Sequence, residues 1–159
     1  MVLVVKDCSK VDMKILRTPD ECFDNLEDYP FEPNYIDLEH HGQTLRMHYL
    51  DENSESKEVV LLMHGEPTWS YLYRKIIPIL VSNGKRVIAP DLIGFGKSDK
   101  PASREDFSYA NHIMWVEKLI KKLDLKNIIF FAQDWGGLIG LRLLAKYPDL
   151  YDGLVVSNS

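Results

Sequence analysis

The segment NIIFFAQDWGGLIGLRLLAKYP, residues 127–148, carries the clearest structural signal in this sequence. Its first six residues, 127–132, contain the apolar run IIFFA, which is typical of a strand buried on both faces of a sheet. The next five, 133–137, predict a tight turn, and residues 138–147 predict a helix that ends before Pro148. A buried strand followed at once by a sharp turn and a helix indicates an α/β protein.

Upstream and downstream of this stretch, strands and helices keep alternating along the chain. Apolar runs predict further buried strands, and the spacing of apolar residues between them predicts helices with one apolar face. Asn83-Gly84 should end the first helix, and Ser108 is the predicted N-cap of the second. The predicted strands are 59–63, 86–90, 127–132 and 153–157, and the predicted helices are 70–80, 108–123 and 138–147.

Two strands of a different kind precede the first buried strand. Tyr35–Glu39 and Thr44–Leu50 are separated by a short turn at residues 41–43, which predicts an antiparallel hairpin. The second strand alternates apolar and polar residues and places His48 on its polar face. The expected fold class is therefore α/β, with a mostly parallel sheet and an antiparallel N-terminal hairpin at one edge.

The ends of the chain suggest how the domain is organised. Residues 1–34 contain three prolines and read as an N-terminal arm that wraps the core, and residues 35–159 read as the first part of a core domain. The chain stops at Ser159, directly after the fourth buried strand, and no further element covers that strand. We therefore expect an N-terminal portion of a longer protein.

Bulk composition excludes several classes of function. The chain has 159 residues, a net charge of -5 and no long run of one sign, which argues against nucleic-acid or anionic-membrane partners. Cys8 and Cys22 show neither metal-ligand spacing nor a disulfide framework, so we expect no metal. The apolar run Val2–Val5 is too short for a signal peptide, and a cytoplasmic location is expected.

The turn at residues 133–137 carries the residue with the clearest chemistry. In Gly-x-Ser-x-Gly hydrolases a nucleophile sits on a sharp strand-to-helix turn flanked by small residues. Here Ala132 replaces the first glycine and Asp134 replaces the serine. A free aspartate has a pKa of about 3.9, so its carboxylate can attack carbon without a base and form an ester. The expected target is an sp3 carbon that bears a leaving group.

Neighbouring donors fit the same chemistry. The indole of Trp135 can donate a hydrogen bond to a departing anion but cannot accept a proton. The backbone N–H of Trp135 lies at a helix start, and that of Glu66 follows an earlier strand, so the two form the predicted oxyanion hole. Asp134 alone would more often be a simple helix N-cap. The buried strand before it and the His64-Gly65 loop favour the functional interpretation.

The histidines are not assigned a catalytic part. His64 is expected to shape its loop, and the other four lie on the hairpin or on a helix, where nothing marks a catalytic base. The segment Gly94-Phe95-Gly96-Lys97-Ser98 contains a Gly-Lys-Ser sequence, but the glycine that a phosphate-binding loop needs earlier is replaced by Asp91. Pro101 also opposes a helix there, so nucleotide binding is rejected.

Three segments together resemble the haloalkane dehalogenases of the α/β-hydrolase superfamily. They are HGEPTWSYLYRK at 64–75, PDLIGFGKSD at 90–99 and QDWGG at 133–137. The resemblance implies that Asp134 displaces halide from a haloalkane and that Trp135 holds the leaving halide. A histidine would then activate water to hydrolyse the ester, with the amides of Glu66 and Trp135 holding the oxyanion. No cofactor is implied.

With glutamate at position 66, this sequence resembles one branch of the family. In that branch the second halide donor is a tryptophan in the cap domain. The other branch has asparagine there and an acid where this chain has Asn158. The cap, catalytic acid and catalytic histidine of the family all lie beyond Ser159, so the C-terminal part is an expected partner and complete turnover by residues 1–159 is not expected. The alternatives are an epoxide hydrolase, which shares the Asp-Trp-Gly turn, and a catalytically incomplete fragment.

Overall fold

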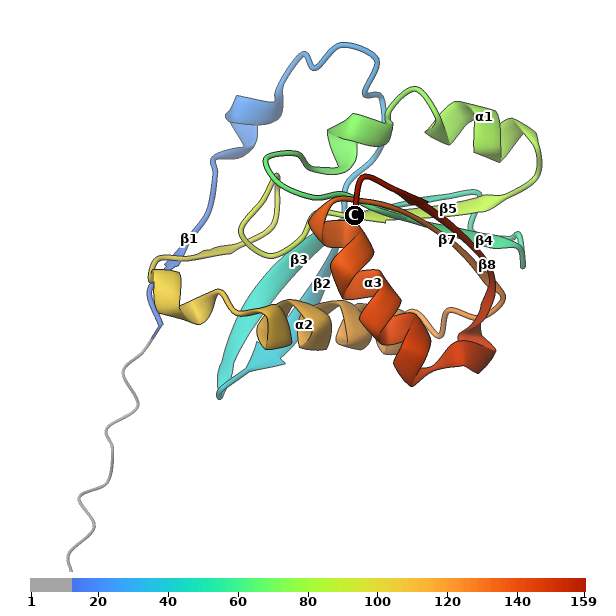
Figure 1. The fold of residues 1–159 in the computed structure, drawn as a ribbon. Helices are drawn as coiled ribbons and strands as arrows, with labels where there is room; N and C mark the ends of the chain where they lie inside the picture. The colour runs from blue at the N-terminus through green and yellow to red at the C-terminus, as the bar shows by residue number, and fades with distance from the viewer. Residues whose placement is uncertain (1–12) are drawn as a thin grey trace, which may run out of the picture.

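The computed structural model describes residues 13–159, so Val2–Val5 and Cys8 lie outside the described residues. A six-stranded sheet with the order β2-β3-β5-β4-β7-β8 forms the centre of this part of the chain (Figure 1). Four neighbouring strands run parallel, and β2, β3 and β5 pair antiparallel. The strands of this sheet are β2 (Asn34–His40), β3 (Gln43–Glu52), β4 (Val59–Met63), β5 (Arg86–Pro90), β7 (Ile128–Gln133) and β8 (Tyr151–Ser157). The predicted α/β sheet with its antiparallel hairpin is confirmed.

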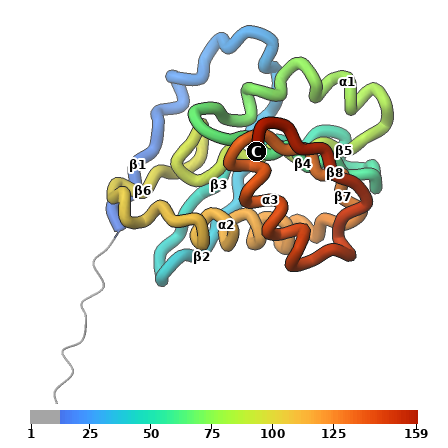
Figure 2. Tube along the Cα trace, in the orientation of Figure 1, coloured from blue at the N-terminus to red at the C-terminus, as the bar shows by residue number. Residues whose placement is uncertain are grey.

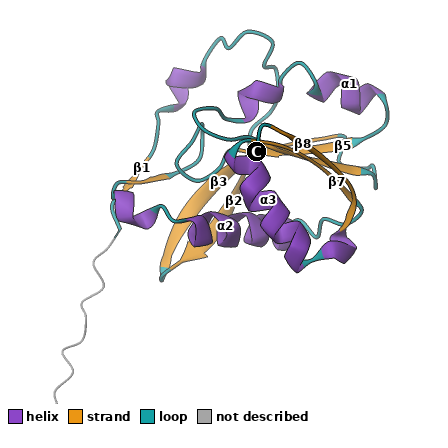
Figure 3. Ribbon diagram, viewed as in Figure 1, coloured by secondary structure: helices purple, strands orange, loops and turns teal. Residues whose placement is uncertain are grey.

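Helices cover both faces of the sheet, as Figure 3 shows: α2 and α3 lie on one face and α1 on the other. The α-helices are α1 (Ile77–Ser82), α2 (Tyr109–Lys122) and α3 (Trp135–Lys146), and four short 3-10 helices lie at Asp20–Phe23, Ser70–Tyr73, Arg104–Asp106 and Pro148–Leu150. The side chains of β4 alternate between two apolar clusters, one on each face. All five residues of β4 are buried, which confirms the prediction from its continuous apolar run.

The prediction of one helix over residues 70–80 is wrong. The segment forms a 3-10 turn at Ser70–Tyr73 and the separate helix α1 from Ile77. Pro78 explains the break, because proline has no N–H to donate and is tolerated only in the first turn of a helix. As a result Tyr73 and Ile77 are buried, whereas Leu72 is exposed.

Two of the predicted buried strands are less buried than expected. In β7 only alternate residues are buried. In β8 the apolar side chains of Leu154, Val155 and Val156 are all exposed. Helix α3 also differs, since it begins at Trp135 rather than Leu138 and ends at Lys146. Ser108 caps α2 as predicted, and its side chain accepts a hydrogen bond from Asn111 N.

The N-terminal segment is more ordered than the prolines suggested. It contains β1 (Ile15–Leu16), which pairs with β6 (Lys100–Pro101) inside the loop predicted for residues 91–101. Arg17 donates to both carboxylate oxygens of Asp99 at 2.7 and 2.9 Å. Further along, Tyr29 Oη hydrogen-bonds to Ser70 Oγ at 2.7 Å. Figure 2 shows the segment, in blue, rising from β1 along one side of the molecule, on the side of the loop between β5 and β6.

A cluster of ion pairs and hydrogen bonds around Glu117 joins α2 to α3. The Glu117 carboxylate accepts hydrogen bonds from Lys121 and Lys146 and from the Tyr147 hydroxyl, at 2.5, 2.7 and 2.6 Å. Burial alone would raise the pKa of Glu117, but these three donors lower it to about 2. A lowered pKa means that the folded state holds the carboxylate charged at a pH where the unfolded chain, with a pKa of about 4.3, binds a proton.

We therefore expect a pH-dependent effect of Glu117→Gln on the free energy of unfolding. The variant should be about 1 kcal/mol less stable at pH 5, a size typical of partly exposed charge clusters. The difference should shrink as the pH falls from about 4 through about 2, because wild-type Glu117 is then protonated too. Urea unfolding at pH 5, 4, 3 and 2 measures this. A difference that stays constant over this range would contradict the assignment.

No helix among residues 13–159 is long and apolar enough to cross a membrane.

Candidate active site

Asp134 occupies the turn between β7 and α3 in a strained backbone conformation. Its φ is 56° and its ψ is -130°, a region that L-residues rarely adopt. It stands at the N-cap position of α3, yet its side chain makes no capping hydrogen bond. Instead the carboxylate Oδ1 accepts the backbone N–H of Glu66 at 2.8 Å. This geometry contradicts the simple N-cap interpretation. The backbone conformation of Asp134 directs its carboxylate toward Glu66 and away from the helix that follows.

The turn is crowded, as the run of small residues predicted. A Cβ on Gly136 would lie 2.3 Å from the carbonyl oxygen of Met63, so helix α3 can approach the end of β4 only with glycine there. A Cβ on Gly65 would lie 2.2 Å from Asp134 Oδ1. On the other side, Asp134 N donates to Asn158 O at 3.1 Å. Figure 2 shows residue 159 beside the start of α3.

His64 holds the loop that carries Glu66. The imidazole is fully buried, and its Nε2 accepts the backbone N–H of Leu92 at 2.9 Å. The remaining proton is therefore on Nδ1, which donates to Gly65 O at 2.9 Å. Burial lowers the pKa of His64, so the ring is neutral. With both nitrogens engaged, His64 shapes the loop, as predicted, and has no free nitrogen with which to take a proton.

The loop after β5 is fixed by a second buried group, Asp91. Its carboxylate accepts hydrogen bonds from the His48 ring and from the backbone N–H groups of Ser70 and Lys97, all between 2.8 and 2.9 Å. Burial alone would raise the pKa of Asp91, but the His48 hydrogen bond and the other nearby groups lower it. His48 was expected on the polar face of its strand, and that expectation is wrong. It is fully buried because it pairs with Asp91.

Asp91 also explains why Gly-Lys-Ser at residues 96–98 is not a phosphate site. Lys97 N donates to the Asp91 carboxylate, and the Ser98 hydroxyl donates to Asp91 O and accepts from His48 N. These groups are thus used within the protein, in agreement with the rejection of nucleotide binding.

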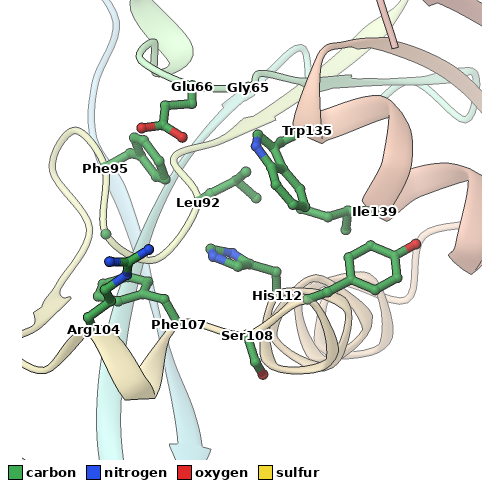
Figure 4. Close-up of a pocket in the computed structure, with 12 residues that line it drawn as sticks. Gly65, Glu66, Leu92, Phe95, Arg104, Phe107, Ser108, His112, Trp135 and Ile139 are labelled. Carbon is green, nitrogen blue, oxygen red and sulfur yellow. The ribbon is translucent and has the colours of Figure 1, made fainter.

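A pocket of about 530 Å³ opens beside Asp134, at the carboxyl ends of the parallel strands (Figure 4). In such sheets ligands collect at this edge. Its walls come from the loops after β4 and β5, from the 3-10 helix at Arg104–Asp106 with the residue that follows it, and from the N-terminal parts of α2 and α3. The lining residues are Gly65, Glu66, Leu92, Gly94, Phe95, Arg104, Phe107, Ser108, Tyr109, His112, Trp135 and Ile139.

Trp135 brings an indole to this pocket. Its side chain is 43% exposed, and Figure 4 shows it among the lining residues, across the space from His112. The indole N–H has no hydrogen-bond acceptor among residues 13–159. A carboxylate with one amide donor, next to an apolar pocket that holds a free N–H, can attack an alkyl carbon and receive a departing anion.

His112 is a pocket residue to which the sequence assigns no role. Its place on a helix marks nothing catalytic, but the structure places it in the pocket wall on the first turn of α2. The signal was available, since a helix that follows a parallel strand begins at the carboxyl edge of the sheet. Burial lowers the pKa of His112 to about 4, so the ring is neutral at pH 7.

Comparison with known proteins gives a consistent result. A model of the alpha/beta hydrolase fold family matches residues 58–159. The chain is 56% identical over 148 residues to a haloalkane dehalogenase of Psychrobacter cryohalolentis. The aligned residues cover 92% of this chain and 49% of that protein. The chain thus spans about half the length of the curated relatives it matches.

Solved structures show the same similarity. A tetrameric haloalkane dehalogenase from Paraglaciecola agarilytica superposes with a TM-score of 0.86 and 45% identity, over 92% of this chain and 50% of that one. An epoxide hydrolase from Vigna radiata superposes with a TM-score of 0.68 and 30% identity, over 79% of this chain and 39% of that one.

Proposed function

Since the chain belongs to the alpha/beta hydrolase fold family, we propose that it provides the nucleophile and half the substrate pocket of a haloalkane dehalogenase. The observation that carries the proposal is the Asp134 carboxylate, which is turned away from its helix and held by Glu66 N–H at 2.8 Å. The curated relatives that share 50 to 56% of its residues are named haloalkane dehalogenases.

The first step is a displacement at carbon. An oxygen of Asp134 attacks the carbon that bears the halogen, a C–O ester bond forms, and halide leaves with the bonding electron pair. The indole N–H of Trp135, which is free in the pocket, would donate to the departing halide. This step needs no base, because a carboxylate oxygen can attack carbon directly.

The second step is hydrolysis of the ester. Water would attack the ester carbonyl, and the backbone N–H groups of Glu66 and Trp135 would hold the oxyanion. The Glu66 amide already lies 2.8 Å from the Asp134 carboxylate. The step needs a base to take the water proton. His64 has both ring nitrogens engaged, and His112, with a pKa of about 4, is a poor base at pH 7. We propose that the base comes from outside the pocket residues described, from the part of the protein that the resemblance places after the matched half.

The pocket favours dehalogenation over the alternative, epoxide hydrolysis. Opening an epoxide leaves an alkoxide that needs a proton, whereas a halide leaves as a stable anion and needs only a hydrogen-bond donor. Tyr109 is the tyrosine among the described lining residues, and its hydroxyl already donates to Leu138 O at 2.8 Å. The indole of Trp135 cannot give up a proton. The similarity to the Vigna radiata epoxide hydrolase keeps this second candidate open to test.

Trp135→Phe tests the proposal directly. We expect bromide release from 1-bromobutane to fall about 10- to 100-fold, because the departing halide loses its hydrogen-bond donor. Wild-type protein should release bromide and leave styrene oxide unchanged. The two substrates are compared by ion chromatography and by diol analysis. Styrene oxide turnover without bromide release would reverse the assignment, and an unchanged rate in Trp135→Phe would remove the halide role of Trp135.

We further propose haloalkanes and halide as the small-molecule partners and the cytoplasm as the site of action. The exposed free thiol of Cys22 is in keeping with a reducing compartment.

A further inference from the structure

The pocket wall holds an uncharged polar group that dehalogenation does not use. His112 lines the pocket from α2, and neither of its ring nitrogens makes a hydrogen bond within residues 13–159. Its Nδ1 is enclosed and unsatisfied, whereas Nε2 is not among the enclosed atoms. The ring extends into the space between Trp135 and Phe107 (Figure 4). Nε2 is thus the nitrogen that a pocket ligand can reach.

The rest of the pocket makes this group unusual. Leu92, Phe95, Phe107 and Ile139 supply apolar walls. The two hydroxyls in the wall each already make one hydrogen bond within the protein, since Ser108 Oγ accepts from Asn111 N and Tyr109 Oη donates to Leu138 O. A plain haloalkane presents no group to His112, which would then stay unsatisfied when the substrate displaces water. Leaving a buried polar group unpaired lowers affinity, and pairing it raises affinity.

The chemistry of the ring narrows the class of ligand. With no partner on either nitrogen, both neutral tautomers are open, so Nε2 can donate or accept. Its pKa of about 4 keeps the ring uncharged at pH 7, and an uncharged imidazole gives no advantage to an anionic ligand. A hydroxyl group, which can also donate or accept, is its natural partner.

Resting on the function proposed above, we infer that His112 is a specificity residue for a hydroxyl at the end of the substrate away from the halogen. The preferred substrates are then short haloalkanols rather than plain haloalkanes. Two charged side chains also line this pocket and compete with His112 as sources of a polar preference. They are the Glu66 carboxylate and Arg104, which is exposed and forms no ion pair within residues 13–159.

The test compares two substrates of equal heavy-atom count, 3-bromo-1-propanol and 1-bromobutane, with the full-length protein in excess over substrate. The readout is the ratio of their second-order rates of bromide release. His112→Leu should lower this ratio about 3- to 10-fold, which is the effect of one neutral hydrogen bond. His112→Gln, which can still donate and accept, should keep the ratio within about 2-fold of wild type.

Arg104→Leu tests separately what the Arg104 cation contributes. It should leave the ratio of the two neutral substrates unchanged and lower only the rate with the anion 3-bromopropanoate. A ratio that is equal in His112→Leu and wild type would overturn the inference, as would a ratio that falls in Arg104→Leu but not in His112→Leu. If wild-type protein releases no bromide from either substrate, the proposed function itself fails and the inference falls with it.

Discussion

Replacing Asp134 with alanine should reduce bromide release from 1-bromobutane to background, a loss of at least about 10⁴-fold. The reason is that the first bond in the proposed reaction forms to Asp134 itself. In wild-type protein, mass spectrometry under single-turnover conditions should find a butyl ester, and the modified peptide should contain Asp134. If the base for the second step is absent from the protein tested, the ester should accumulate to one per chain.

Asp152→Ala is the matched control, because Asp152 is an exposed carboxylate on β8 in the same part of the chain. It should release bromide at the wild-type rate. A bromide burst that survives in Asp134→Ala, or an adduct on any other residue, would show that Asp134 is not the nucleophile.

The stability of variants at position 134 measures the backbone strain in the turn. Asp134→Gly should be more stable than Asp134→Ala by about 1 kcal/mol, because glycine adopts a φ of 56° without a Cβ clash. Both variants lose the hydrogen bond from Glu66, so this loss cancels in the comparison.

Gly65→Ala is expected to be the second most damaging change. The new methyl group would lie 2.2 Å from Asp134 Oδ1, and the other two nearest atoms also belong to the Asp134 side chain. The carboxylate must therefore move, and it would lose its fixed position against Glu66 N–H. A displacement of about 1 Å at a reacting atom costs on the order of 100-fold, so bromide release should fall by at least that factor.

Gly153→Ala is its control, since a Cβ there would meet only two Ile129 side-chain atoms, both at the ordinary distance of 3.8 Å. That variant should keep the wild-type rate. A double-mutant cycle checks the cause: Gly65→Ala should destabilise wild type more than it destabilises Asp134→Gly, in which the clashing atoms are gone. Two results would contradict this account. One is an equal loss of stability from Gly65→Ala in wild type and in Asp134→Gly, and the other is bromide release by Gly65→Ala within about 3-fold of the wild-type rate.

Local pattern was sufficient for most of the fold. The continuous apolar run of β4 and the Ser108 cap of α2 were predicted because each depends on neighbours in the sequence. Prediction failed at residues 70–80, where a helical spacing of apolar residues hid the effect of Pro78. It failed again at His48, whose burial depends on Asp91, 43 residues away.

The same division holds for the site. The sequence was enough to predict a carboxylate on a sharp turn between a buried strand and a helix, because small residues and an apolar run mark that turn locally. The three-dimensional arrangement was needed to show that the Asp134 side chain does not cap α3, since it accepts a hydrogen bond from Glu66, 68 residues away on the loop after the neighbouring strand β4. It was also needed to show that both ring nitrogens of His64 are hydrogen-bonded and that His112 lines the pocket. Such facts depend on which loops meet at the carboxyl edge of the sheet, and side-chain contacts between distant loops leave no periodic trace in the sequence.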